Sequence, residues 1–198
     1  SAARVPPSSI TADSIGFTIA PRLNASGRLD TPDTSLRLLT TPSTQEAYEL
    51  AATLERLNVE RKRLSERLTA RARESVQAQM PKEKLLFVAG EEFHPGINGL
   101  VAGTLAREFN RPAVVVSIRD GLAHGSGRSS TQEFDLALAF TSCDSLFLRS
   151  GGHSAAAGFT ADRYSLPEIC LRLQERARES LAKANLTPSL DIDAIVPL

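Results

Sequence analysis

A run of residues with helical periodicity limits what this chain can fold into more than any other feature of the sequence. The expected helix covers residues 43–80, with Ser43 and Glu46 spaced as a capping box at its start and Pro81 at its end. Its apolar side chains recur three, four or seven residues apart, and they are Leu50, Leu54, Leu57, Leu64, Leu68, Ala72 and Val76. At 1.5 Å per residue, roughly 35 residues of such a helix span about 50 Å, the length of a strut between domains or of one arm of a coiled coil.

The sequence after this helix has a different pattern. Apolar segments at 84–90 and 111–119 are typical of buried strands, and they alternate with helical patterns at 98–109, 134–143 and 165–184. This alternation predicts an α/β domain, a mixed sheet flanked by helices. The glycine-rich segments 122–130 and 150–159 are expected in loops or at the ends of elements, the second running into a strand or turn or a tightly packed helix start.

The part before the long helix reads as a connection. A short helix is expected after Thr11, a turn around Pro21, and then a small polar segment at 24–28. A second short helix follows, capped by Thr31 or Asp33.

Composition excludes some classes of protein. Lys and Arg (23) balance Asp and Glu (23), which argues against a wholly basic nucleic-acid coat, although 19 of the 23 cations are arginine. No apolar run is long enough to cross a bilayer, and no secretory signal is visible. Cys143 and Cys170 have no C-x-x-C partner, so we expect reduced core thiols in a cytosolic protein. The three histidines form no metal-ligand pattern, and the lack of an initiator methionine suggests a piece of a longer chain.

Two glycine-rich stretches carry the chemistry. In "GSGRS" (125–129) glycines permit close backbone approach, while Ser126, Ser129 and the fork of Arg128 suit a phosphate or carboxylate; a plain turn with a solvated arginine is the alternative. In "GGH" (151–153) the glycines again permit close backbone approach, and His153 could hydrogen-bond a phosphate; a structural histidine is the alternative. His94 before a helix start is a weaker signal of the same kind.

Five segments together resemble a known family. They are "FTIAPRLNASGRLD", "LERLNVERKRL", "HPGINGLVAG", "GSGRSS" and "GGHSAAAGF", in this order over nearly the whole chain. The set is similar to the middle-to-late part of the RecJ family, the single-strand-specific exonucleases of the DHH phosphoesterase superfamily. The resemblance implies an interdomain segment (1–42), a connecting helix (43–80), a DHH-associated domain (82–185) and the entry to an OB-fold (186–198), where Leu190, Ile192 and Ile195 alternate.

The resemblance also implies a function. The whole enzyme would remove nucleotides 5′→3′ from single-stranded DNA in repair and recombination, in the bacterial cytoplasm, with Mn²⁺ or Mg²⁺ bound by a DHH domain preceding residue 1. This chain would be its nucleic-acid-binding half and inactive alone. The resemblance also implies single-strand-binding protein and a RecQ-type helicase as partners.

Site residues follow from the matched motifs. His153 would assist at the scissile phosphate, while Ser126 and Arg128, with Gly127 and Ser129, would hold the 5′ end or a nearby phosphate. The remaining expected contacts to the strand are Gly151, Gly152, Arg22, Asn24, Arg28, His94 and Gly96. Asn98 stands where the family pattern has an aliphatic residue, and His124 where a basic residue is common, which would weaken one phosphate contact or make it pH-sensitive.

Three other hypotheses remain open. A nano-RNase or phosphoadenosine phosphatase of the same superfamily would share "GGH" but lack the long helix. A non-catalytic nucleic-acid-binding module, such as the related domain of alanyl-tRNA synthetase, would lack "PRLNASGRL". An interaction protein built around residues 43–80 would form a stable dimer.

Overall fold

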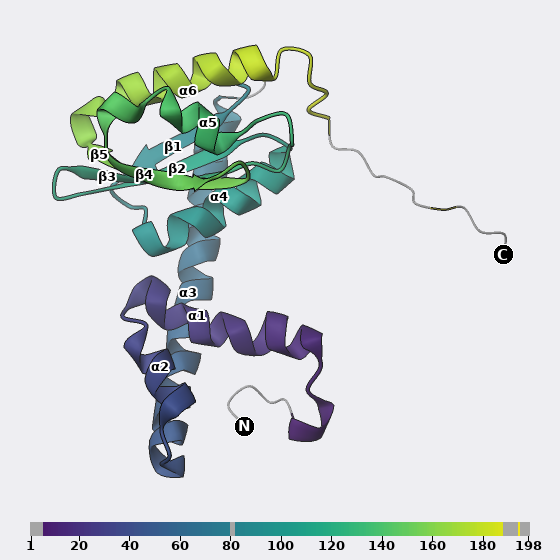
Figure 1. Ribbon diagram of the computed structural model, residues 1–198, viewed down its shortest axis with the longest axis vertical. Helices are drawn as coiled ribbons and strands as arrows, with labels where there is room; N and C mark the ends of the chain where they lie inside the picture. The colour runs from purple at the N-terminus through teal and green to yellow at the C-terminus, as the bar shows by residue number, and fades with distance from the viewer. Residues whose placement is uncertain (1–5, 80–81, 188–193, 195–198) are drawn as a thin grey trace.

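The computed structural model describes residues 6–79, 82–187 and 194, and one long helix runs through most of its length (Figure 1). This helix, α3 (Thr44–Gln77), has 34 residues and is therefore about 51 Å long. Ser43 caps its start by accepting a hydrogen bond from the Glu46 N–H, but the Glu46 carboxylate contacts Thr41 and Arg37 and does not complete the expected capping box. Pro81, expected to end the helix, lies outside the described residues.

The segment before α3 folds into helices that pack on its first half. A 3-10 turn η1 (Pro7–Ser9) leads to a π-helical stretch η2 (Ser14–Ile19), which continues into α1 (Ala20–Leu29), and α2 (Asp33–Thr40) follows. The turn expected at Pro21 is wrong: Pro21 lies in the first turn of α1, where its missing N–H costs nothing.

The small residues of "NASGR" are helical because they pack. Ala25 and Ser26 are fully buried, and the Ser26 and Ser35 hydroxyls lie 2.7 Å apart, so that α1 and α2 approach closely. The polar segment expected at 24–28 is thus a helix interface.

The α/β domain contains a five-stranded mixed sheet of order β1-β2-β3-β5-β4. Its strands are β1 (Leu86–Gly90), β2 (Ala113–Arg119), β3 (Leu122–Arg128), β4 (Phe147–His153) and β5 (Ala156–Asp162). Only the β1–β2 pair is parallel. Asp120 and Gly121, both with positive φ, form the two-residue turn between β2 and β3.

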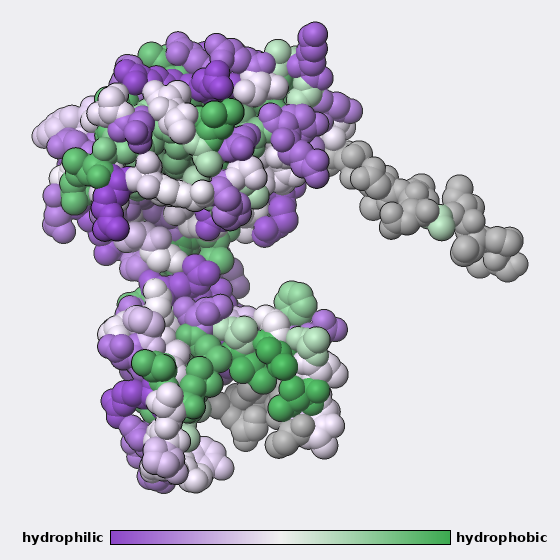
Figure 2. Space-filling view, in the orientation of Figure 1, coloured by the Kyte–Doolittle hydropathy of each residue, from purple (hydrophilic) through white to green (hydrophobic). Residues whose placement is uncertain are grey.

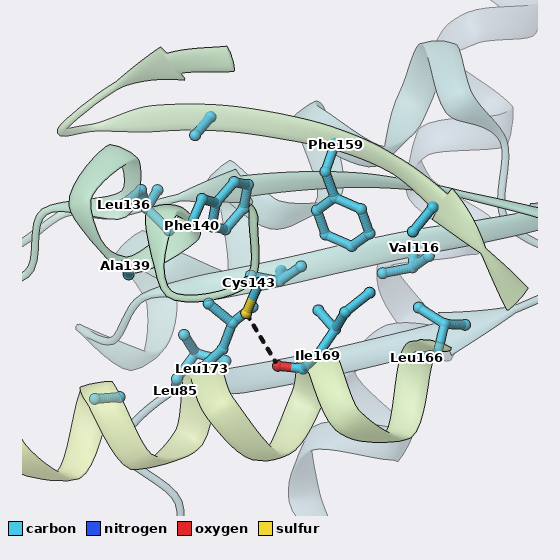
Figure 3. Close-up of a cluster of buried hydrophobic side chains, with 14 of the residues drawn as sticks. Leu85, Val116, Leu136, Ala139, Phe140, Cys143, Phe159, Leu166, Ile169 and Leu173 are labelled. Carbon is cyan, nitrogen blue, oxygen red and sulfur yellow. Dashed lines mark hydrogen bonds between the residues drawn. The ribbon is translucent and has the colours of Figure 1, made fainter. Parts of the chain in front are cut away.

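Helices cover both faces of the sheet, as Figure 1 shows. On one face lie α4 (Pro95–Phe109) and the last turns of α3, packed on Leu86, Val88, Ala113 and Val115. On the other lie α5 (Leu136–Thr141) and α6 (Leu166–Ser180), around the core of Figure 3 with Phe140, Phe159 and Ile169. Two short 3-10 turns, η3 (Asp144–Leu146) and η4 (Arg163–Ser165), lead into β4 and α6. The expected α/β architecture is confirmed.

The glycine-rich segment 122–130 is not a loop, because most of it is the central strand β3. Its backbone pairs with β2 on one side and β5 on the other. The glycines are required by packing: a Cβ at Gly125 would meet the Phe159 ring at 2.2 Å, and one at Gly127 would meet Leu136 at 3.0 Å. The backbone of "GSGRS" is therefore mostly paired within the sheet and is not a loop that an anion could approach closely.

The segment "GGHSAAAGF" forms the hairpin between β4 and β5, not a helix start. Gly152 has φ 144°, and a Cβ there would lie 2.4 Å from the Ala156 carbonyl oxygen. Gly151 is different, because a Cβ there would meet nothing within 4 Å. The fold of this hairpin requires Gly152 but does not require Gly151.

The cysteines and the outer edge of β1 complete the description. Cys143 is buried, its Sγ 4.0 Å from the Ile169 carbonyl oxygen (Figure 3), and Cys170 is half-buried; both are unpaired. Burial raises the pKa of both thiols. The Gln79 side chain binds the outward-facing N–H and C=O of Phe87. Among the described residues, no helix could serve as a membrane span.

Candidate nucleic-acid interface

Three arginines from different elements meet where α1 touches the α/β domain. Arg28 lies in the last turn of α1, Arg61 near the middle of α3, and Arg128 at the end of β3. The approach of α1 is close: Arg28 Nη1 donates to the Gly96 carbonyl at 3.2 Å, and a Cβ at Gly96 would lie 1.9 Å from the Arg28 carbonyl oxygen. We call Arg28, Arg61 and Arg128 the arginine trio.

Glycines of α4 make room for Arg128. A Cβ at Gly99 would lie 2.5 Å from Arg128 Nη2, so any other residue would displace the guanidinium. Gly103 lies under the Arg128 side chain one turn later. The one hydrogen bond of this guanidinium within the described chain joins Nη1 to the Gly127 carbonyl at 2.7 Å. The remaining donors of Arg128 are therefore free to bind a ligand.

The trio is electrostatically uncompensated. Within residues 6–79 and 82–187, none of the three arginines forms an ion pair. Burial, and secondly the charge of Arg28, lowers the pKa of both Arg61 and Arg128. Arg61 Nε is buried without a hydrogen-bond partner, while its Nη2 donates to the buried Asn58. An anion at this position would relieve the repulsion and satisfy the unpaired donors.

The register of the sheet extends this site onto an open strand face. Arg128 pairs with Ala156, and Ala156 pairs with His153, so the three residues form a row across the sheet. Neighbouring strands are about 4.8 Å apart, so the Cα atoms of Arg128 and His153 lie about 10 Å apart. Ser126, Gly158 and Gly151 form the adjacent row on the same face. His153 and Gly151 are exposed, and the Ser126 side chain is half-buried.

His94 has a structural task. It is the N-cap of α4, and its Nδ1 accepts a hydrogen bond from the Gly96 N–H at 3.1 Å. The His94 carbonyl accepts from the N–H groups of Ile97 and Asn98. Burial, and secondly the Arg119 charge, lowers the His94 pKa, which keeps the ring neutral and able to accept. The first N–H groups of α4 are thus already satisfied.

The structure therefore places the site residues expected from the sequence in different locations. Arg28, Gly96 and Arg128 come together at the junction, and Ser126, Gly151 and His153 line the adjoining strand face. The others are placed otherwise: Arg22 pairs with Glu55, Asn24 is exposed on α1, the Ser129 hydroxyl donates to Thr131, and Gly127 and Gly152 serve packing and backbone conformation. Their binding roles remain predictions.

Arg61 was not expected from the sequence, although a signal was present. The apolar positions of the long helix skip from Leu57 to Leu64, and Arg61 occupies the position that would close this gap. Asn58, three residues earlier on the same face, is also polar and fully buried, with 1% of its surface exposed. A charged residue in the apolar phase of a helix indicates a buried electrostatic contact.

Asn98 and His124, which depart from the expected pattern, lie in one network behind the site. Asn98 Nδ2 donates to Ser117 Oγ at 3.0 Å and to the His124 carbonyl at 2.9 Å. His124 Nδ1 lies 3.3 Å from Thr160 Oγ1. These contacts tie α4 to β2, β3 and β5, so both residues support the strand that carries Ser126 and Arg128.

Known proteins share the sequence and the fold of this chain. A family model described as the DHHA1 domain matches residues 82–181. The single-stranded-DNA-specific exonuclease RecJ of Bacillus subtilis is 36% identical over 185 residues, which are 92% of this chain and 23% of that protein. The Escherichia coli RecJ is 32% identical over 91% of this chain and 32% of its own length. The chain thus spans about a quarter to a third of these relatives.

Solved structures give the same result. RecJ of Thermus thermophilus in complex with Mg²⁺ has a TM-score of 0.76 and 35% sequence identity, over 85% of this chain and 26% of that one. An exonuclease RecJ bound to manganese has a TM-score of 0.73 and 34% identity, over 89% and 44% of the two chains.

Proposed function

This chain belongs to the DHHA1 domain family, and from this premise we propose that it forms the nucleic-acid-binding part of a RecJ-type exonuclease that degrades single-stranded DNA in the 5′→3′ direction. The observation that carries the proposal is the arginine trio, three convergent cations without a carboxylate partner in the described chain. The same single strand would pass over the open face of β3, β5 and β4. Its setting would be DNA repair and recombination in the bacterial cytoplasm, with single-strand-binding protein and a helicase as partners.

Each part of the site has a task in this proposal. The trio holds a phosphate at or near the 5′ end, with Arg128 gripping it through its free fork. The bare backbone at Gly151 lets the sugar-phosphate chain approach the sheet. His153, about 10 Å from Arg128 across two strand spacings, hydrogen-bonds the next phosphate along the strand.

The metal ions of the related structures do not fit the described residues of this chain. In 6–79 and 82–187, no three His, Cys, Asp or Glu side chains gather into a site that could hold a metal. We therefore place the Mn²⁺ or Mg²⁺ ligands in a DHH domain outside this chain. The segment boundaries 1–42, 43–80, 82–185 and 186–198 stand as part of this proposal; Pro188, Leu190, Ile192 and Ile195 of the expected OB-fold entry lie outside the described residues.

The test is the affinity of the chain for a short 5′-phosphorylated single strand, measured by fluorescence anisotropy. Arg128→Ala should weaken binding by about 1–3 kcal/mol, because a charged hydrogen-bonding partner is lost. Arg172→Ala is the matched control, since Arg172 pairs with Glu168 on α6, across the sheet from the trio. Equal affinity of the Arg128 variant and the wild type would exclude the trio as the phosphate site.

A second measurement concerns activity. We expect the chain alone to release no nucleotides from single-stranded DNA with Mn²⁺ present, because the described residues offer no metal site. Cleavage that persists through purification and disappears with Arg128→Ala would show that the catalytic groups lie in this chain.

A further inference from the structure

A large groove lies along α3 on the side away from the arginine trio. Its volume is about 950 Å³, and it lies between the middle of α3 and the part of the α/β domain that contains Glu92, His94 and Arg119. Arg56, Arg63 and Arg67 of α3 line one side of the groove, and His94 and Arg119 of the α/β domain, the latter at the end of β2, line the other. We call these five residues the basic groove.

The groove carries a surplus of positive charge. Among the described residues, none of its four arginines forms an ion pair. Three glutamates also line it, but Glu55 pairs with Arg22 at 2.5 Å and Glu92 lies 3.5 Å from Arg71, both arginines outside the groove. Glu60 alone is left to offset four arginines.

Helix geometry separates the groove from the trio. Each residue of a helix advances by about 100°, so positions 56, 63 and 67 lie on the side of α3 opposite to Leu54, Asn58 and Arg61. The two sites nevertheless meet at the start of α4. His94 lines the groove, and two residues later the Gly96 carbonyl accepts the hydrogen bond of Arg28. A polymer that leaves the trio can therefore enter the groove by passing this helix end.

The lining indicates the chemistry of the ligand. Arginine forks match phosphate oxygens, and no Phe, Tyr or Trp lines the groove as a stacking platform for bases. From Arg56 to Arg67 the helix rises about 17 Å, the length of about five nucleotides in a stacked strand. Lining of this kind recognises a phosphate backbone without reading its sequence.

We propose that the basic groove binds the phosphate backbone of single-stranded nucleic acid, about five nucleotides long, downstream of the end held by the arginine trio. The inference rests on the proposed function, because the same strand occupies both sites. Two linked contacts raise affinity through effective concentration, so the groove adds to the binding of long strands and not of short ones.

The experiment compares two triple variants with the same change in charge. The groove variant removes three positive charges from the groove through Arg56→Gln, Arg63→Gln and Arg67→Gln. The control variant changes Arg172, Arg176 and Arg178 of α6 to Gln, three arginines outside the groove that pair with glutamates. Anisotropy is measured with a 5′-phosphorylated thymidine trinucleotide and with an oligothymidylate of about 20 nucleotides, at several salt concentrations.

The expected result is specific to length. The groove variant should bind the long strand at least about tenfold more weakly, and its salt slope should fall by about 2, roughly 0.7 for each lost arginine. Its affinity for the trinucleotide should equal that of the wild type, and the α6 control should match the wild type on both. Glu60→Gln should act in the opposite direction, tightening long-strand binding by about two- to fivefold.

Other outcomes overturn the inference in distinguishable ways. In one outcome, the groove variant keeps the long-strand affinity and salt slope of the wild type, while Arg128→Ala still weakens the binding of both oligonucleotides. This would reject the groove as a binding site and leave the proposed function intact. If the wild type binds neither oligonucleotide, both the groove proposal and the proposed function are rejected. Binding of a polyglutamate peptide that needs the groove arginines, without a loss for the long strand, would assign the groove to an acidic protein segment.

Discussion

The helical region (residues 14–66) and the α/β domain (82–187) are built on different kinds of contact. Within residues 14–66, Ala25 and Leu54 are the only apolar residues that the structure buries, whereas the α/β domain and the end of α3 hold two continuous apolar clusters. Polar contacts join the helices instead, among them Arg22–Glu55 and Ser26–Ser35. We infer that contacts with α3 hold the other helices of the helical region in position, and that the apolar core stabilises the α/β domain.

The surface shows the same contrast. In Figure 2, hydrophobic side chains gather over the helical region, while hydrophilic ones dominate the visible face of the domain. The exposed apolar side chains of the helical region include Phe17, with 82% of its surface exposed, together with Ile15, Leu36, Leu39 and Tyr48. The trio lies where the two regions meet, so its geometry depends on both.

The largest expected effect tests the contrast directly. Leu105→Ala, in the fully buried centre of α4, should lower the free energy of unfolding by about 2–5 kcal/mol through lost packing and a cavity. Leu39→Ala, at a side chain that is 68% exposed, should change it by less than about 0.5 kcal/mol. Urea unfolding measures both. Similar losses would mean that the helical region has an apolar core of its own.

A second substitution acts on the seam between the regions. Gly96→Ala should cost about 1–3 kcal/mol, because its methyl group would collide with the Arg28 carbonyl oxygen and push α1 away from α4. Gly103→Ala is the control on the same helix; its Cβ finds 3.5 Å to the nearest atom, so the change should be neutral or stabilising. If both variants unfold at the same urea concentration, the two regions are not in firm contact.

A third comparison sets two arginines of α1 against each other. Arg22→Ala breaks the pair with Glu55 and should cost at most about 1 kcal/mol in stability, with little effect on DNA affinity. Arg28→Ala should weaken DNA binding, since Arg28 belongs to the trio. Anisotropy and urea unfolding on both variants decide whether the strand also runs past Arg22, as the sequence suggested; a loss of affinity with Arg22→Ala would establish that path.

The smallest expected effect depends on pH. The fold lowers the pKa of His94 below 6.5, so the unfolded chain binds the proton more readily, and this contribution to stability is lost as pH falls from 6.5 through the lowered value. His94→Asn keeps an N-cap acceptor without a titrating ring. Between about pH 7 and pH 5 the variant should lose less stability than the wild type, by under about 1 kcal/mol. Parallel pH curves of the two melting temperatures would show that folding does not lower the pKa of His94.

The sequence predicted the elements of this molecule better than the purpose of its glycines. The long helix and the α/β alternation followed from periodicity, which reflects burial along each element. "GSGRS" looked like a loop because glycine and serine are common in turns. The reason for Gly125 lies in Phe159, a residue 34 positions later, which local pattern cannot connect to it.

The candidate site was predictable in part for the same reason. Arg128 and His153 stood out through their unusual neighbours, but their common row across the sheet depends on strand register, which a single sequence does not give. Arg22 and Arg28 looked equivalent in "PRLNASGRL". The structure shows Arg22 turned toward Glu55 and Arg28 toward Gly96, because six positions on a helix separate them by more than one and a half turns.

The Gln79 side chain has a consequence for how this sheet meets other chains. By binding the N–H and C=O of Phe87 that point away from the sheet, it occupies part of the β1 edge and leaves less room for a foreign strand there. The opposite edge, β4, has exposed residues from Leu148 to His153. If strands of two copies paired, the β4 edge is where we expect them to meet, and an oligonucleotide bound on the proposed nucleic-acid face beside it should hinder such aggregation.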